Sequence, residues 1–322
     1  LGCPHKCVFC DQSTISGERR KHYTPDMLAE DVLPRIERLK RKGKTAEIAF
    51  FGGTFTGLPT DYMTALLDKA QILIAQSGGV LTGVRCSTRP DFITADIVRL
   101  FRDYGGTAIE LGAQSMDTDV LRLSRRGHTA EDVFTAAHII KESGLELGLQ
   151  MMTGLPSDTR EKCISTAQDF IRGGTDTVRI YPTVVMRGTV LADMEYTGFT
   201  FAETVSICAD LLGLFAENGV RVIRVGLNAS PDVRDNMVGG NYADALGEIV
   251  LSEYYYRRIV AAFDVLGGTV FDIKIPRTSA SVLRGQRGSN MARFKGNGIS
   301  VRITEDNTVT NFAEITRLNI TE

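Results

Sequence analysis

The sequence predicts an α/β fold, in which a partial (β/α)6 TIM-like barrel over residues 1–227 is followed by an appended α+β subdomain over 228–322. Two observations predict it. Short apolar segments alternate with helical segments of about 10–17 residues, which is the pattern of a parallel sheet with helical crossovers. The alternation stops near Leu227, where a segment rich in Gly, Asn, Asp and Pro begins. Six strands suit a curved, partly open barrel better than a closed barrel of eight.

The first predicted helix begins after Thr24, because Thr can cap a helix and Pro25 fits its first turn. It should run to about Lys42 with a kink at Pro34. The other predicted helices are 60–76, 94–103, a short one after 117, 129–144, 158–171 and 202–217. The six predicted strands are 46–51, 80–88, 107–111, 145–151, 177–181 and 220–225. We expect a further strand to precede Cys3, mostly outside this sequence.

The C-terminal subdomain has a different pattern. A loop over 228–241 precedes a long predicted helix over 242–266. The remaining predicted elements are a strand over 269–275, a helical segment over 279–294, and a hairpin of 299–304 and 309–315. Asp306-Asn307 would form the turn of this hairpin.

Composition limits the class of protein. The chain is 43% hydrophobic, which is enough for a sizeable core, and its net charge is −2. A nearly neutral chain has no overall field that attracts nucleic acid or an anionic membrane. No apolar run approaches the length of a membrane span and no signal peptide is visible, so we predict no membrane partner. Six cysteines, three of them clustered, suit a reducing compartment, and we predict a cytoplasmic location.

Three cysteines near the start of the chain, Cys3, Cys7 and Cys10, have the spacing C-x3-C-x2-C. A structural zinc site needs four ligands, and a disulfide would leave one cysteine over. In a 4Fe–4S cluster three thiolates leave one iron open, and an open iron can bind a substrate or cofactor. The pattern therefore favours a 4Fe–4S cluster on these three cysteines. A zinc site completed by His5, His22 or a distant cysteine is the alternative.

Polar or glycine-rich clusters follow five successive predicted strands. The active sites of such barrels lie at the carboxyl ends of the strands, and paired glycines let the main chain approach a ligand closely. Each cluster alone fits a turn, but the set predicts an active site at this end of the barrel. The clusters are Phe51-Gly52-Gly53-Thr54-Phe55, Ser87-Thr88-Arg89-Pro90-Asp91, Glu110-Leu-Gly112-Ala-Gln114-Ser115, Gln150-Met151-Met152-Thr153-Gly154-Leu155-Pro156 and Arg179-Ile180-Tyr181-Pro182-Thr183.

These motifs resemble the radical S-adenosylmethionine (radical SAM) superfamily, whose signature is C-x3-C-x2-C. Within it they resemble the radical SAM domain of the Elongator catalytic-subunit family, in the form of a short bacterial-type relative. The resemblance covers about residues 1–225. Besides the cysteines, the motifs that carry it in order are Phe51-Gly-Gly-Thr-Phe-x-x-Leu-Pro59, Thr88-Arg-Pro-Asp91, Glu110-x-Gly-x-Gln-Ser115, Arg126-Gly-His-Thr129, Met152-x-Gly-Leu-Pro156 and Ile180-Tyr-Pro-Thr183.

The resemblance implies that a 4Fe–4S cluster on the three cysteines binds S-adenosylmethionine. One electron from a flavodoxin- or ferredoxin-type donor would cleave the cofactor and give a 5′-deoxyadenosyl radical, which abstracts hydrogen from the substrate. Gly52, Gly53 and Thr54 would meet the methionyl group. The whole predicted cofactor-binding set is Phe9, Gly52, Gly53, Thr54, Thr88, Glu110, Gln114, Ser115 and Met152.

Tyr181, Arg179 and His128 are the predicted catalytic residues, because they could touch the substrate or quench a radical; Arg126 is a further candidate of this kind. For His128 the alternative is a place beside a helix cap at Thr129. The other three cysteines, Cys86, Cys163 and Cys208, are predicted to be core residues, although Cys86 lies near a strand end and could instead face the cavity.

The chain also departs from the family. Eukaryotic and archaeal members space their first two cysteines further apart and carry an acetyltransferase domain that uses acetyl-CoA. Residues 228–322 are too few for that domain, so we predict that no acetyl-CoA domain is present. Arg179 stands where the family commonly has Lys.

A basic segment bears on the substrate. Residues 274–304 contain no Asp or Glu, and such local positive charge is typical of phosphate binding. RNA, and tRNA in particular, is therefore one predicted substrate, and a solvated basic face is the alternative. A small molecule, tetrapyrrole or peptide substrate is the second hypothesis, and a non-catalytic iron–sulfur or zinc protein the third. The basic residues are Lys274, Arg277, Arg284, Arg287, Arg293, Lys295 and Arg302.

Overall fold

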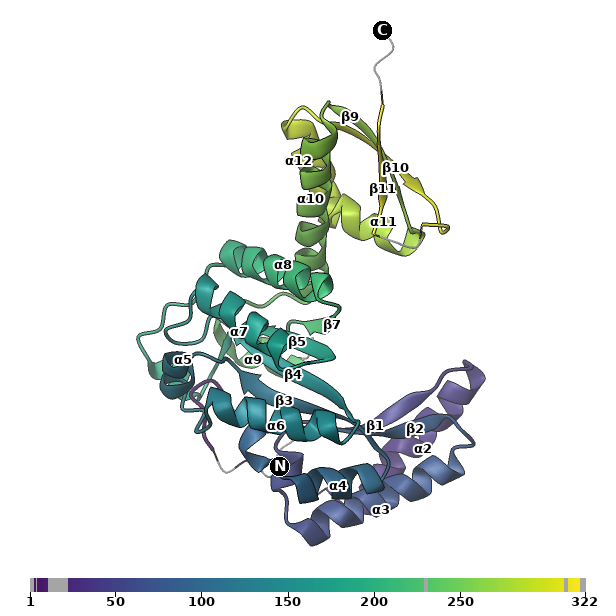
Figure 1. Cartoon of the computed structure of the whole chain (residues 1–322), viewed down its shortest axis with the longest axis vertical. Coiled ribbons are helices and arrows are strands. Elements are labelled where there is room, and N and C mark those ends of the chain that lie inside the picture. The colour runs from purple at the N-terminus through teal and green to yellow at the C-terminus, as the bar shows by residue number, and fades with distance from the viewer. Residues whose placement is uncertain (1–2, 4, 11–22, 229–230, 310–311, 319–322) are drawn as a thin grey trace. The chain divides into compact units, whose positions relative to one another are not determined.

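The computed structural model of the protein describes residues 3, 5–10, 23–228, 231–309 and 312–318 (Figure 1). The chain forms two compact units. The first comprises Leu1–Thr200 and Phe215–Tyr242, and the second Phe201–Leu214 and Ala243–Glu322. This division differs from the domain boundary predicted between 227 and 228, which stays a prediction.

The first unit is built on one six-stranded parallel sheet with the strand order β1-β2-β3-β4-β5-β7. Each strand pairs with the next one along this order, as the wall of a barrel requires. The strands are β1 Ala46–Phe50, β2 Leu81–Thr88, β3 Gly106–Gln114, β4 Glu146–Thr153, β5 Thr177–Pro182 and β7 Arg221–Val225. The predicted six-stranded half-barrel is confirmed. A short antiparallel pair, β6 Val184–Met186 with β8 Met237–Gly240, was not predicted.

Helices join these strands (Figure 1), and most of these helices begin with a capping side chain. Thr24, Thr94, Asp117, Thr129 and Thr159 each accept a hydrogen bond from a main-chain amide of the first turn. The first helix continues through Pro34. The helices are α2 Pro25–Arg41, α3 Thr60–Gln76, α4 Ala95–Asp103, α5 Thr118–Leu123, α6 Ala130–Glu142, α7 Arg160–Arg172 and α9 Pro231–Asn236, with short 3-10 turns η1 Phe55–Gly57, η2 Pro90–Phe92 and η3 Val190–Asp193.

The two faces of the sheet differ because successive side chains of a strand point to opposite sides. One face carries fully buried apolar side chains such as Ile109, Leu147 and Val178. We call it the outer face. The adjacent residues of the same strands, Glu110, Glu146 and Arg179, lie on the other side, which we call the inner face.

The second unit has a three-stranded mixed sheet with the order β10-β9-β11. Its core includes Phe263 and Phe271, whose rings stack with centroids 3.9 Å apart. Its elements are part of α8 Phe201–Glu217, then α10 Leu246–Leu266, β9 Val270–Ile275, α11 Arg277–Arg284, η4 Gln286–Gly288, α12 Ser289–Gly296, β10 Ser300–Glu305 and β11 Glu314–Arg317. No helix in the described parts of either unit is long and apolar enough to cross a membrane.

The predicted hairpin of the last two strands is wrong. β10 pairs in parallel with β9, and β11 pairs antiparallel with β9 on its other edge. Phe271, Ile273 and Ile275 of β9 are fully buried, so this strand belongs in the centre of the sheet. The connection from Glu305 to Glu314 is also longer than the two-residue loop of a tight hairpin.

Candidate active site

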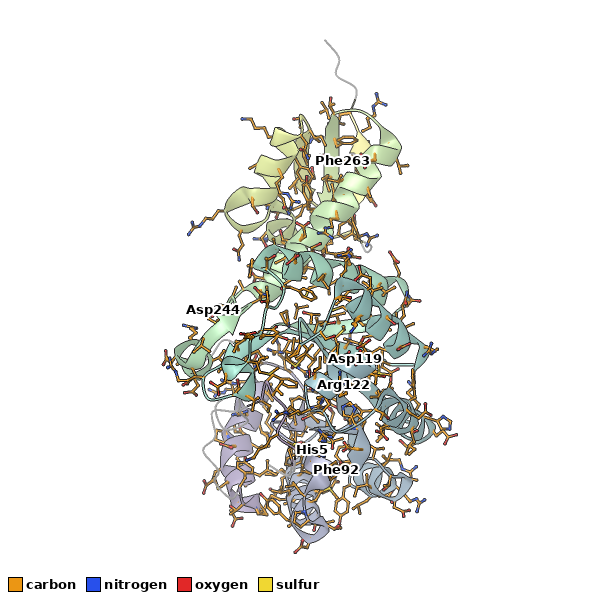
Figure 2. All side chains as sticks on the ribbon, turned by 90° about the vertical axis from the view of Figure 1, so that its left-hand side faces the viewer. His5, Phe92, Asp119, Arg122, Asp244 and Phe263 are labelled. Atoms are coloured by element: carbon orange, nitrogen blue, oxygen red, sulfur yellow. The ribbon has the colours of Figure 1, made fainter. Side chains whose placement is uncertain are left out.

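The cysteine loop is held at the carboxyl edge of the parallel sheet by main-chain hydrogen bonds. The amide of Val8 donates to the carbonyl of Ser124 over 3.1 Å, and the amide of Leu191 donates to the carbonyl of Val8 over 2.8 Å. Figure 2 shows His5 next to Phe92, and the Nε2 atom of His5 lies 3.8 Å from a carboxylate oxygen of Asp91, beyond the end of β2. The loop also shares a buried apolar cluster that comprises Cys7, Val8, Phe9, Val120, Leu155, Val185 and Leu191.

The three cysteines of this loop differ in exposure. Cys7 is buried, Cys3 is partly exposed and Cys10 is exposed. The amide of Cys10 donates to the carbonyl of Cys7 over 3.1 Å, which closes a turn. In the part of the chain that the structure describes, no three His, Cys, Asp or Glu side chains converge as they would on a single metal ion. A 4Fe–4S cluster binds each thiolate at a separate iron, so its ligands need not converge on one point.

A buried arginine lies against the middle cysteine. Arg126 is only 6% exposed, and its Nη1 atom donates to the Sγ atom of Cys7 over 3.1 Å. Its Nε atom donates to Nε2 of His128 over 3.3 Å, and its Nη2 atom donates to the carbonyl of Gly112 on β3. Because a guanidinium does not lose its proton in proteins, a fixed positive charge sits beside Cys7.

His128 is buried between Arg126 and the start of α6. Its Nδ1 atom lies 3.3 Å from the carbonyl of Thr129. Since Nε2 accepts from Arg126, the proton of the neutral ring belongs on Nδ1. Burial and the neighbouring Arg126 lower the pKa of His128 to about 4. Thr129 and Asp132 form the capping box of α6, so His128 lies beside a helix cap, as the alternative reading expected.

Gln114, at the end of β3, has both a strained main chain and an unsatisfied side chain. Its φ is +71°, which costs a residue other than glycine of order 1–3 kcal/mol. Residues strained in this way are often found at functional sites. Its Oε1 atom is buried and has no hydrogen-bond partner among the described residues. Its Nε2 atom would lie 3.2 Å from a Cβ placed on Gly112, whose carbonyl accepts from Arg126. An unpaired buried acceptor suits a ligand that brings N–H donors.

The ends of β1 and β2 hold four of the predicted site residues. Gly52 has φ +95°, which favours glycine, and Gly53 and the buried Thr54 follow it. The hydroxyl of Thr56 donates to the carbonyl of Phe92 over 2.9 Å, so it accepts from Thr88 in the 2.6 Å contact between the two hydroxyls.

Arg89, expected at the barrel mouth, is buried instead. It makes two hydrogen bonds of 2.9 Å to the carboxylate of Asp91. The guanidinium is buried, and the Nη1 atom of Arg89 has no partner among the described residues. A side chain that the sequence assigned to the open mouth therefore helps to fix the loop between β2 and α4.

Ser115 and Met152 have different surroundings from Gln114. The hydroxyl of Ser115 accepts from the amide of Asp117 over 3.1 Å and lies 3.4 Å from the hydroxyl of Thr166 on α7. Ser115 is thus engaged with helices. Met152 packs against the apolar cluster that holds the cysteine loop.

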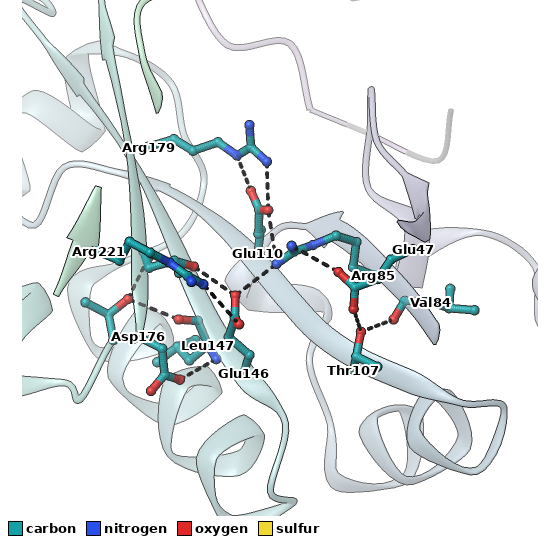
Figure 3. A network of polar contacts seen from close by, with 12 residues as sticks. Glu47, Val84, Arg85, Thr107, Glu110, Glu146, Leu147, Asp176, Arg179 and Arg221 are labelled. Atoms are coloured by element: carbon teal, nitrogen blue, oxygen red, sulfur yellow. Dashed lines mark hydrogen bonds and ion pairs between the residues drawn. The ribbon is translucent and has the colours of Figure 1, made fainter. Parts of the chain in front are cut away.

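Glu110 is the centre of an ion-pair network on the inner face (Figure 3). Its carboxylate, 1% exposed, accepts from Nε and Nη2 of Arg179 over 2.6 and 3.0 Å and from Nε2 of Gln150 over 3.1 Å. The network continues through Arg85, which lies 3.3 Å from Glu47, 3.0 Å from Glu146 and 3.7 Å from Glu110. The network therefore links five neighbouring strands, β1 to β5.

The sequence reasoning missed Arg85, Glu47 and Glu146. A signal for them was present, because a charged residue inside a strand of a buried parallel sheet needs a partner on a neighbouring strand. Arg85 and Glu146 stand at such positions in the predicted strands 80–88 and 145–151.

Two of the predicted catalytic residues lie together and the third lies elsewhere. Arg179 and Tyr181 both lie on the inner face of β5. The Cζ atom of Arg179 lies 5.2 Å from the ring centroid of Phe51. Burial raises the pKa of Tyr181, against the effect of the Arg179 charge. His128 belongs to the Arg126 group. The catalytic roles of all three stay predictions.

The remaining cysteines are core residues, as predicted. Cys86, Cys163 and Cys208 are buried. Burial raises the pKa of the Cys86 thiol, so this thiol stays protonated at neutral pH. The Sγ atom of Cys163 donates to the carboxylate of Asp158 over 3.1 Å.

A parallel half-barrel with a three-cysteine loop at the carboxyl edge of its strands defines the class of radical SAM enzymes. The model of the Radical SAM superfamily matches residues 1–170, and the model of the Radical_SAM C-terminal domain matches residues 175–256. The chain belongs to the radical SAM superfamily. The cofactors of this superfamily are a 4Fe–4S cluster and S-adenosylmethionine, as predicted.

The resemblance to the Elongator family is also confirmed. The tRNA uridine(34) acetyltransferase of Methanocaldococcus infernus is 27% identical over 77% of this chain and 53% of its own length. Elongator complex protein 3 of Schizosaccharomyces pombe is 31% identical over 65% of this chain and 46% of its own length. The chain spans about half the length of these relatives. The structure of an N-terminally truncated Elp3 from M. infernus, 24% identical, covers 73% of this chain and 61% of its own with a TM-score of 0.63, which shows the shared fold.

Proposed function

We propose that this radical SAM enzyme holds its 4Fe–4S cluster on Cys3, Cys7 and Cys10 and modifies RNA, specifically tRNA. The observation that supports the cluster assignment is the position in which the cysteine loop is held. Main-chain bonds at Val8 fix the loop at the carboxyl edge of the sheet, where Arg126 provides a positive charge for the Cys7 thiolate. Negative thiolates beside a buried cation are suited to bind iron.

The surrounding residues fit S-adenosylmethionine as well. When bound, the two cofactors supply one-electron reductive cleavage of the sulfonium, with the electron from a flavodoxin- or ferredoxin-type donor. The unpaired Oε1 atom of Gln114 would accept from the cofactor, and Gly52 and Gly53 would let the main chain approach it. The apolar cluster around Val8 and Leu191 would keep water from one side of the loop. The other predicted contacts, the cytoplasmic location and the lack of an acetyl-CoA domain stay predictions.

RNA as the substrate is supported by the relatives and by part of the basic segment. Four of its seven cations already pair with carboxylates, Arg277 and Arg284 with Glu305, Arg293 with Glu253 and Arg302 with Asp272. Lys274, Arg287 and Lys295 are exposed and form no ion pair within the described residues. These three residues, which we call the unpaired cations, are available to contact phosphates.

Cofactor cleavage is tested by anaerobic reconstitution with iron, sulfide, S-adenosylmethionine and reductant, followed by chromatography for 5′-deoxyadenosine. We expect wild-type protein to form it and Cys7→Ala to form none. Cys208→Ala, which also removes a buried cysteine, should match wild type. Product from Cys7→Ala equal to that of wild type would refute the cluster assignment.

RNA binding is tested by gel shift with tRNA over a range of salt concentrations. Reversal of the three unpaired cations to Glu should weaken binding and flatten the dependence of affinity on salt, since each lost phosphate contact releases about one counterion fewer. The matched control reverses Arg99, Arg102 and Arg122, which are exposed and paired with Asp residues of the first unit. Equal loss in both triple variants would contradict a specific RNA surface. Cofactor cleavage without any tRNA binding would favour a small-molecule or peptide substrate.

A further inference from the structure

We propose that Arg126 raises the reduction potential of the cluster by donating a charged hydrogen bond to the Sγ atom of Cys7, and that Gly112 and His128 position its guanidinium for this task. This inference rests on the proposed function, because it takes Cys7 as a ligand of the cluster. The inference assigns to Arg126 a role in setting the reduction potential of the cluster, and this role requires no contact with the substrate.

The contacts of Arg126 leave its charge directed at the sulfur. The three donating atoms of the fork, Nη1, Nε and Nη2, reach Cys7, His128 and Gly112. His128 and the carbonyl of Gly112 are both uncharged, so neither of them neutralises the guanidinium. By contrast, Arg89 and Arg179 each make two hydrogen bonds to one carboxylate. Arg126 alone of these three directs its charge at a thiol.

A cation in this place acts on the potential in one direction. The cluster gains one electron on reduction, so its charge becomes more negative. A positive charge and a hydrogen bond at a ligand sulfur stabilise the reduced form more than the oxidised form, and they do so strongly where water is excluded. Arg126 is buried beside the apolar cluster of the loop, with its Cζ atom 6.0 Å from the ring centroid of Phe9.

His128 and Gly112 hold the guanidinium still. His128 accepts from Nε of Arg126, and the ring is itself bound through Nδ1 to the carbonyl of Thr129 at the cap of α6. Gly112 is part of β3, one of the two central strands of the half-barrel, and supplies its main-chain carbonyl. Two rigid elements therefore fix the direction of the Nη1 donor. A side chain so constrained loses little entropy when it binds the thiolate.

The test is an anaerobic redox titration of the cluster-loaded full chain, followed by electron paramagnetic resonance at matched iron content. At a fixed potential we expect Arg126→Met to lower the ratio of reduced to oxidised cluster at least tenfold, which for one electron is about 59 mV towards more negative potential. Arg122→Met is the control. It removes the same charge from an exposed arginine that pairs with Asp119, as labelled in Figure 2, and should leave the ratio unchanged.

Equal ratios in Arg126→Met and Arg122→Met would overturn the inference. If Arg126→Met does not retain its cluster, Arg126→Gln takes its place, because the amide keeps a donor and loses the charge; a wild-type ratio in that variant overturns the inference too. For the positioning role, His128→Leu should lower the ratio and His128→Gln should restore it. A wild-type protein that assembles no iron–sulfur cluster would instead refute the proposed function.

Discussion

Polar side chains are paired differently in the middle of the inner face and at its carboxyl edge, although the same strands form both regions. In the middle, Glu110 on β3 is bound by side chains from β2, β4 and β5. At the edge, four residues further along the same strand, the Oε1 atom of Gln114 has no partner among the described residues. Buried polar groups are rarely left unpaired without a functional reason. The middle therefore holds neighbouring strands together, and the edge has a free acceptor that the proposed cofactor would pair.

The largest expected effect lies in the middle. Glu110→Ala would leave Arg179 and Arg85 as half-buried cations without their central carboxylate, so we expect the free energy of unfolding to fall by about 3 kcal/mol. Anaerobic urea unfolding followed by circular dichroism measures it. Asp119→Ala breaks only an exposed pair and should cost less than about 1 kcal/mol. Similar losses of unfolding free energy in the two variants would show that the Glu110 network contributes no more to stability than an exposed ion pair.

A second effect is the dependence of stability on pH that His128 should cause. The pKa of His128 in the folded chain, about 4, is below its ordinary value of 6.5, so on acidification the unfolded chain binds the proton first. Its contribution to stability is complete above pH 6.5 and is lost between pH 6.5 and 4, by at most about 1.4 kcal/mol for each pH unit. His128→Gln should reduce the slope of the free energy of unfolding against pH in this range, measured by urea unfolding at several pH values. The exposed His138→Gln should leave this slope unchanged. An unchanged slope in His128→Gln would contradict its burial as a neutral ring.

The smallest effect on stability is expected at the edge itself. Gln114→Ala removes a side chain with an unpaired acceptor and should change stability by less than about 1 kcal/mol, whereas Gln114→Gly should be about 1 kcal/mol more stable than the Ala variant because its φ is positive. Both variants should bind S-adenosylmethionine about tenfold more weakly, since one hydrogen bond is lost. Calorimetry on cluster-loaded protein measures the affinity. Unaltered affinity would place the cofactor elsewhere.

The sequence was most informative where the pattern is local. Strand–helix alternation and capping residues such as Thr94 and Thr129 depend on near neighbours in the chain, and they predicted the half-barrel. The motifs at strand ends also pointed to the edge where the structure places the cysteine loop, because parallel strands bring their carboxyl ends together.

Pairing across the chain was the part that could not be predicted. Arg85 meets Glu146 only because β2, β3 and β4 lie side by side in one register, and β9 separates the two strands that were expected to pair. The basic segment appeared uncompensated because its carboxylate partners, among them Glu253, lie outside it in sequence. Periodicity specifies which side of an element is buried, and it does not specify which residues of distant elements meet.

The attachment of Val8 has a consequence for how the protein matures. Ser124 and Leu191, which hold this residue, are synthesised long after it. The thiols therefore emerge from the ribosome well before the platform that orders them exists. Iron and sulfide delivered early would meet an unshaped peptide, so assembly of the metal centre should follow the folding of the whole half-barrel, as a late step in the life of the chain.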